Sequence, residues 1–313
     1  MNIFLEPAIL FFVFGIVAGL VKSNLVIPES ISKFLSLYLF MSLGLKGGFA
    51  LNRTEFTTEI IEIIFLGVIL SIIIPISTYF ILKNFISKFD AAAVAATYGS
   101  VSAVTFVTAT QYLTSYSIEY NGIMAAVMAI MEIPAIILAI LFSNWARKQN
   151  TYNLKNVFHE SLTHGTSLLL IGALIIGFLS GDFGQNSMQT FAFDLFKGLL
   201  AFFLLDMGLQ VAKNMPSLKN NNIILLGYGI TFPIMYASLT LIISGIMNIS
   251  LGNTVLLMIL ASSASYIAVP AVIKNSIPEA NPGIYIGLSL GLTFPFNILI
   301  GIPLYTEIAR RFL

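Results

Sequence analysis

Apolar runs long enough to cross a lipid bilayer follow one another along nearly the whole of this chain. A helix needs about 20 mostly apolar residues to cross the hydrocarbon core. Of the 313 residues, 58% are hydrophobic and 9% are charged, whereas about 25% charged residues are usual in a soluble domain. We therefore predict an all-α polytopic membrane protein. Its ten expected spans cover residues 6–22, 29–50, 58–83, 91–113, 120–145, 162–179, 188–212, 222–246, 252–275 and 283–308.

The composition disfavours several classes of function. A net charge of +1 argues against nucleic acid as a partner. The chain has no cysteine, so it has no disulfide and no thiolate site. It also lacks the HExxH and P-loop motifs, and no membrane-embedded histidine is available to activate Ser100. We therefore expect neither an enzyme nor a cofactor.

Basic residues predict how the chain lies in the cell membrane. Cytoplasmic loops carry an excess of Lys and Arg. Ten basic residues fall on the first face, at connectors that follow odd-numbered spans: Lys22, Lys33, Lys83, Lys88, Arg147, Lys148, Lys155, Lys213, Lys219 and Lys274. Four fall on the opposite face: Lys46, Arg53, Arg310 and Arg311. The first face is therefore predicted to be cytoplasmic, with both termini outside.

The two halves of the chain resemble each other. Matched features in the same order are Leu37–Lys46 with Ala201–Gln210, Pro75 with Pro233, Asn121 with Asn281, Pro134 with Pro295, and Ala146 with Ala309. We predict a first five-helix repeat at residues 1–148, a short cytoplasmic connector at 149–160 and a second repeat at 161–313. Since five is an odd number of spans, the second repeat is inverted relative to the first, as in many secondary transporters.

Two small-residue stretches, Ala95–Thr105 and Leu260–Pro270, occupy equivalent positions in these repeats. We predict that each breaks its helix and that the two broken helices cross. Opened backbone in hydrocarbon must be satisfied by protein, water or a ligand, and the new helix N-termini attract anions. Small residues also permit close helix packing, but their pairing in both halves favours a site. The expected anion-binding residues are Gly99, Ser100, Val101, Ser102, Ser262, Ser263, Ala264 and Ser265.

Oxygen atoms near the breaks suit Na⁺, the expected coupling ion and the only metal expected. Glu132 lies inside a span, where a carboxylate is a functional candidate; the alternative is a protonated Glu132 bonded to a neighbouring helix. Its repeat counterpart lies near Thr293 and Asn297. The expected sodium-binding residues are Thr105, Glu132, Tyr266, Thr293 and Asn297.

Three other groups are assigned structural roles. We expect Asp206 to pair with Lys197 or Lys46, although an ion-ligand role stays open. Lys46 is also expected to extend toward the interface. His159 and His164 are expected at the surface.

At these residues the chain resembles the sodium-dependent bicarbonate transporter family. The motifs that carry the resemblance are Leu25–Glu29, Gly44–Gly48, Gly99–Ser102, Glu132–Ala135, Ala261–Ser265, Ile277–Pro282 and Ile302–Leu304. The resemblance implies ten spans in two inverted repeats and a core domain that moves against a gate domain. It also implies a homotrimer, and bicarbonate held between the broken helices with Na⁺ nearby.

The sequence departs from cyanobacterial members of that family in three places. They have a long cytoplasmic insert between the fifth and sixth spans, and the short connector here argues against a PII-like regulator. They have Asp where this chain has Tyr266, and Asp-Ile-Pro where it has Glu132-Ile-Pro. Tyr266 either supplies a phenol or fills the pocket.

The sequence thus predicts a Na⁺-coupled symporter that imports bicarbonate or a similar small anion. Alternatives are a transporter of another small organic or inorganic anion, a non-transporting membrane sensor of an anion and Na⁺, and, disfavoured by the missing base, an intramembrane enzyme.

Overall fold

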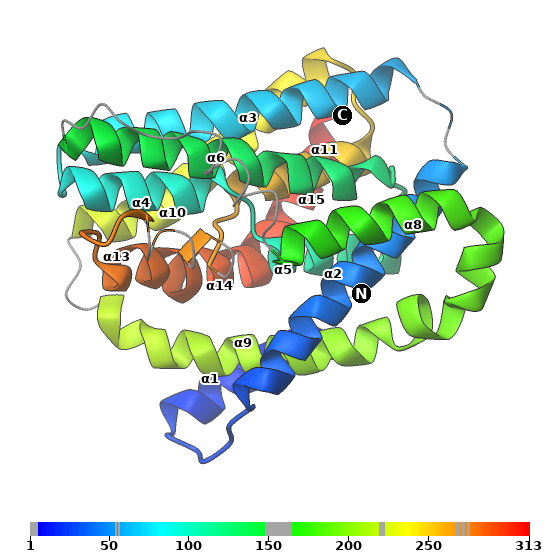
Figure 1. The fold of residues 1–313 in the computed structure, drawn as a ribbon, viewed down its shortest axis with the longest axis horizontal. Helices are drawn as coiled ribbons and strands as arrows, with labels where there is room; N and C mark the ends of the chain where they lie inside the picture. The colour runs from blue at the N-terminus through cyan, green and yellow to red at the C-terminus, as the bar shows by residue number, and fades with distance from the viewer. Residues whose placement is uncertain are drawn as a thin grey trace.

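The computed structural model describes residues 6–53, 55, 57–147, 165–218, 223–266, 269, 270, 273 and 276–313. The predicted connector at 149–160, which includes His159, lies outside these residues, and so does His164. Every regular element across the described residues is a helix (Figure 1). The predicted all-α class is therefore confirmed.

The helices follow the predicted apolar runs closely. The first half contains α1 (Pro7–Leu20), α2 (Glu29–Asn52), α3 (Thr58–Leu82), α4 (Lys88–Gly99), α5 (Ala103–Ser115) and α6 (Ile123–Arg147). The second half contains α8 (Gly165–Ser187), the π-turn η2 (Thr190–Asp194), α9 (Phe196–Leu218), α10 (Ile223–Ile246) and α11 (Leu251–Ser262). It ends with α13 (Pro282–Ile286), η3 (Gly287–Thr293), α14 (Phe294–Phe296), η4 (Asn297–Gly301) and α15 (Ile302–Phe312).

Length and hydropathy separate two kinds of segment. Among the described residues, eight helical segments are long and apolar enough to cross a membrane. The apolar helices α1 and α11 are shorter, with 14 and 12 residues. In α11 the reason is local, because the helix stops at Ser262 inside the predicted small-residue stretch.

The helices form two groups (Figure 1). Helix α1 packs along α9, and α2 packs along α8; we call these four helices the four-helix unit. Helices α3, α4 and α6 pack on one another, and α10 and α11 pack together beside η3, η4 and α15. These helices, with α5, α13 and α14, are here called the crossing unit, after the contact between α5 and α11 within it. The two units meet mainly where α9 lies against η3 and α2 lies against α6.

Glycines set the spacing inside the four-helix unit. A methyl group added to Gly208 on α9 would lie 2.2 Å from the Phe12 carbonyl oxygen on α1. A methyl group on Gly177 of α8 would lie 2.6 Å from the Leu45 carbonyl oxygen on α2. Lipid supplies no hydrophobic drive for helix association, so membrane helices depend on close packing. Glycine permits that close approach because it has no side chain. Both helix pairs are therefore packed backbone to backbone.

The crossing unit is built around α4 and α5. In the apolar window of Lys88–Ser115, 94% of residues are buried, against 28% in the window of Leu168–Ser187 on α8. Helix α4 can be enclosed in this way because its residues from Ala91 to Ala96 are small and fully buried. Its last residue, Gly99, lies against Pro75 of α3, where an added methyl group would be 2.7 Å from the proline ring.

One hydrogen bond occurs in the same form in both halves. The Asn281 N–H donates to Asp90 Oδ1 at 2.7 Å, and the Asn121 N–H donates to Asn253 Oδ1 at 2.8 Å. Asp90 and Asn253 are the third residues of α4 and α11, and the two asparagines precede the last span of each half. Each short helix before a break therefore holds the start of the last span in the opposite half.

The glycine packing generates a prediction on α8. Gly177→Ala should lower thermal stability in detergent, by an amount typical of overpacking, about 1–3 kcal/mol. Gly172→Ala on the same helix is the matched control, because a methyl group there meets nothing within 4 Å, and Ala favours helix over Gly. A Gly177→Ala protein as stable as the Gly172→Ala protein would show that α2 and α8 are not in close contact.

Candidate functional site

Both predicted small-residue stretches contain a helix break. Helix α4 ends at Gly99, and Ser100 is extended, with φ −87° and ψ 158°. Helix α5 then starts at Ala103. Helix α11 ends at Ser262, and Ser263 is extended in the same way, with φ −90° and ψ 163°. Residues 263–265 carry no regular structure.

The two breaks hold each other. The Ser265 N–H donates to the Thr97 carbonyl oxygen at 2.7 Å. The Ser102 N–H donates to Ser263 Oγ at 2.9 Å, and that hydroxyl donates to the Leu260 carbonyl oxygen at 3.1 Å. Each break therefore satisfies backbone groups that the other break exposes, which the membrane interior could not do.

The first break ends in a capped helix N-terminus. Ser102 Oγ accepts hydrogen bonds from the Thr105 N–H at 3.2 Å and from Thr105 Oγ1 at 2.9 Å. The N–H groups of Ala103 and Val104 have no acceptor within the helix, because first-turn N–H groups precede the helix ladder. Both residues line a small void of about 10 Å³ between α5, α2 and α9. An N-terminus of this kind favours an anion.

Two buried hydroxyls at the breaks have no partner. Among the described residues, Ser100 Oγ makes no hydrogen bond, and the Tyr266 hydroxyl makes none of good geometry, although the Ser102 side chain lies near it; the two side chains are only 0% and 8% exposed. An unsatisfied buried hydroxyl costs about 1–3 kcal/mol. Polar groups left in this state mark places where a ligand or water completes the bonding.

The remaining predicted anion residues are all buried at the crossing. Ser262 Oγ donates within its own helix to the Ile259 carbonyl oxygen at 3.3 Å. Ser265 Oγ accepts from the Val269 N–H at 3.4 Å. Val101 and Ala264 supply apolar walls, with 1% and 2% exposure.

The predicted sodium residues are distributed around the crossing. Thr105 lies at the cap of the first break, and Asn297 Nδ2 donates to the Ser262 carbonyl oxygen at 2.8 Å. Thr293 Oγ1 instead donates to the Gly229 carbonyl oxygen at 2.7 Å. Glu132 is buried on α6, at 5% exposure, and interacts with another group of the protein. Tyr266 stacks at a tilt on Phe294, with 4.8 Å between ring centroids.

Thr293 and Asn297 lie in a last span that the apolar pattern predicts as an ordinary helix. Thr293 ends the π-turn η3 and Asn297 starts the π-turn η4. Single π-turns within helices are frequent at functional sites. The widened turns bring Thr293 to Tyr98, whose hydroxyl lies 2.6 Å from Thr293 Oγ1, and Asn297 to the end of α11. Tyr98 was missed in the sequence, although it immediately precedes Gly99.

The predicted pairing of Asp206 with a lysine is wrong. Its carboxylate accepts hydrogen bonds from Ser32 Oγ at 2.5 Å and from Gln210 Nε2 at 3.0 Å. Lys197 is roughly 14 Å away along the axis of α9 at 1.5 Å per residue. The Lys46 ammonium instead lies 3.4 Å from the centroid of the Phe196 ring.

Asp206 is also closer to the candidate site than its sequence position indicates. It is 4% exposed and lies within electrostatic range of the Tyr266 phenol in the second break. No sequence pattern indicates this approach, because it depends on how α9 packs against the crossing unit.

The geometry agrees with a comparison against known protein families. Residues 7–310 match the Na⁺-dependent bicarbonate transporter superfamily. The chain belongs to this superfamily. Membership of a transporter superfamily and the eight apolar helices together indicate a multi-pass membrane protein. No curated protein matches the sequence.

The contact between the breaks generates a prediction about Ser263. Ser263→Ala removes the acceptor of the buried Ser102 N–H, so it should lower the free energy of unfolding of this protein by about 1–3 kcal/mol. Ser262→Ala, which removes a 3.3 Å bond within α11 and leaves no backbone N–H without its acceptor, should cost less. The measurement is thermal unfolding of both variants in the same detergent. Equal midpoints for the two would show that the Ser102–Ser263 bond contributes nothing to stability.

Proposed function

We propose that this chain is a Na⁺-coupled symporter that imports bicarbonate or a similar small anion, bound where the two breaks meet. The observation that carries the proposal is the pair of unpartnered buried hydroxyls, Ser100 and Tyr266, beside the free N–H groups that start α5. Membership of the Na⁺-dependent bicarbonate transporter superfamily supports the same assignment.

Neutral donors at the crossing suit a small monoanion. Residues 95–105 and 260–266 contain no Lys or Arg, so the anion would be held by hydroxyls, N–H groups and the α5 dipole. Such donors bind without the desolvation penalty of a buried ammonium. The anion would be contacted by five serines, and small or apolar neighbours would allow its close approach. The serines are Ser100, Ser102, Ser262, Ser263 and Ser265, and the neighbours are Gly99, Val101 and Ala264.

Na⁺ would bind to oxygen atoms beside the anion. Thr105, Asn297 and the carbonyl groups opened at the breaks are nearest the crossing, while Glu132, Thr293 and Tyr266 would complete or support the ligand set. Moving one charge inward through 100 mV is worth about 2.3 kcal/mol. Since bicarbonate carries one negative charge, one Na⁺ cancels the electrical cost and a second adds net drive.

We propose that the two halves form ten spans in an inverted repeat. The paired Asn281–Asp90 and Asn121–Asn253 hydrogen bonds support it. So does the packing of α1 on α9 and α2 on α8, since exchanging the halves turns one pair into the other. Transport would then proceed by movement of the crossing unit against the four-helix unit. The protein would lie in the cell membrane as a homotrimer with both termini outside.

The deciding experiment is uptake of labelled bicarbonate into proteoliposomes with and without an inward Na⁺ gradient. We expect uptake that requires Na⁺ and is competed by unlabelled bicarbonate. Uptake that continues unchanged without Na⁺ would remove the coupling. Stronger competition by another small anion would reassign the substrate, and anion binding without uptake under any gradient would indicate a sensor.

Bulky side chains at the breaks should abolish anion binding. Ser100→Leu and Ser262→Leu each fill the space between the breaks, so we expect bicarbonate binding to fall at least tenfold. Ser238→Leu is the matched control, because Ser238 is exposed on the apolar surface of α10. The measurement is bicarbonate affinity of purified protein, with a check that each variant elutes as wild type. Wild-type affinity in both break variants would refute the site.

A further inference from the structure

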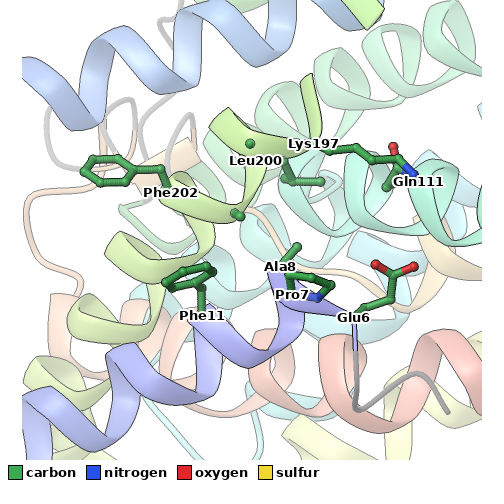
Figure 2. Close-up of a pocket in the computed structure, with 10 residues that line it drawn as sticks. Glu6, Pro7, Ala8, Phe11, Gln111, Lys197, Leu200 and Phe202 are labelled. Atoms are coloured by element: carbon green, nitrogen blue, oxygen red, sulfur yellow. The ribbon is translucent and has the colours of Figure 1, made fainter. Parts of the chain in front are cut away.

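A cavity of about 400 Å³ lies between the two units, at the starts of α1 and α9 and the end of α5. Its lining is Glu6, Pro7, Ala8, Phe11, Gln111, Lys197, Gly198, Leu200, Ala201 and Phe202. Figure 2 shows Glu6, Gln111 and Lys197 on one side and Phe11 and Phe202 on the other. All three polar side chains lie at helix ends on the N-terminal face, the face predicted to be outside. The few polar groups of this mainly apolar lining therefore lie toward that face, which we call the mouth of the cavity.

The cavity and the small void at the first break lie along one helix. Gln111 contributes to the cavity, while Ala103, Val104 and Val107 of the same helix line the void. These positions recur every three to four residues, so they share one face of α5. From Val104 to Gln111 the face runs roughly 10 Å at 1.5 Å per residue. One stripe of α5 thus connects the outer cavity with the break.

Buried apolar side chains line the void. Phe203 of α9 is 0% exposed, Phe40 of α2 is 6% exposed, and Val107 of α5 is 2% exposed. All three line the void, and Phe203 directly follows Phe202 of the cavity lining in the chain. A dry contact of this kind passes neither water nor a hydrated ion, as in channels closed by hydrophobic constrictions.

Charge at the mouth favours an anion. Lys197 is exposed, and the Lys46 ammonium lies over the ring of the preceding residue, Phe196. The cavity lining itself holds one cation, Lys197, and one carboxylate, Glu6. Lys46 lies outside the lining but within electrostatic range of Lys197. Two cations near one carboxylate concentrate anions.

We propose that this face of α5 is the outer route to the breaks, with Lys197 as a transient binding site for a small monoanion and Phe203 as the plug below it. The route rests on the proposed function for its destination, the anion site at the breaks. Movement of the crossing unit would carry α5 past Phe203 and join the cavity to the void.

Because the chain has no cysteine, single-cysteine variants can test the cavity without background. Gln111→Cys is expressed in cells and labelled from outside with two membrane-impermeant thiosulfonates, one anionic and one cationic. We expect both to react, which requires a water-filled cavity. Failure of both reagents would overturn the proposal, because it would mean that lipid or protein fills this space.

Charge variants then test the role of Lys197. In the Gln111→Cys background, Lys197→Gln should slow the anionic reagent about threefold, the effect of one charge about 6 Å away in water, and should not slow the cationic one. Glu6→Gln is the matched opposite change and should speed the anionic reagent. Equal changes for both reagents would indicate altered structure and would refute the electrostatic role.

The plug is tested at Val104→Cys, beside the void. We expect slow labelling by the anionic reagent, and at least tenfold faster labelling after Phe203→Ala. Phe14→Ala, at a 54% exposed position of α1, is the control and should change nothing. As a check on the fold, Gln111→Cys should react at the same rate with and without the Phe203→Ala substitution.

An unchanged Val104→Cys rate in the Phe203→Ala protein would refute the plug. These rates need no transport. If bicarbonate uptake fails while the labelling pattern holds, the proposed function fails and the route stands. If uptake succeeds while the labelling pattern fails, the route fails and the proposed function stands.

Discussion

The fold depends on how backbone groups opened inside an apolar environment find partners. Helix α4 stops at Gly99 and α11 stops at Ser262, and hydrocarbon offers no hydrogen bonds to the groups released there. The Ser265–Thr97 and Ser102–Ser263 bonds supply part of the answer. Each break therefore takes hydrogen-bond partners from the other half of the chain. The buried alanines of α4 follow from the same need, since they allow α3 and α6 to surround the break.

The groups that the protein leaves unsatisfied are as informative as those it satisfies. Asn297 bonds to the last carbonyl group of α11, and Ser102 caps the start of α5. At the same place, the hydroxyls of Ser100 and Tyr266 have no hydrogen-bond partner. Ser100→Ala and Tyr266→Phe would remove these unpaired hydroxyls and keep the rest of each side chain. Their retention in a buried position is the physical reason for placing the ligand between the breaks.

Local features of the sequence predicted the helices and the breaks, but contacts between distant helices set the details of the site. Apolar runs give the spans, and the small residues of Ala95–Thr105 and Leu260–Pro270 give the interruptions. The partner of Asp206 could not be predicted, because Ser32 reaches it only through the approach of α2 to α9. The π-turns that position Thr293 and Asn297 leave no mark in an apolar pattern. The repeat and the ion ligands themselves stay predictions.

An aromatic chain connects the second break to the four-helix unit. Tyr266 contacts Phe294, and Phe294 meets Phe12 of α1 edge to face, with 5.4 Å between ring centroids. The proposed movement of the crossing unit would separate Phe294 from Phe12, at a cost of about 0.5–1.5 kcal/mol beyond buried area. A single Na⁺ crossing 100 mV is worth about 2.3 kcal/mol. The ring contact between the units therefore costs less to break than one Na⁺ would supply under the proposed coupling, while the glycine-packed helix pairs resist movement within the four-helix unit.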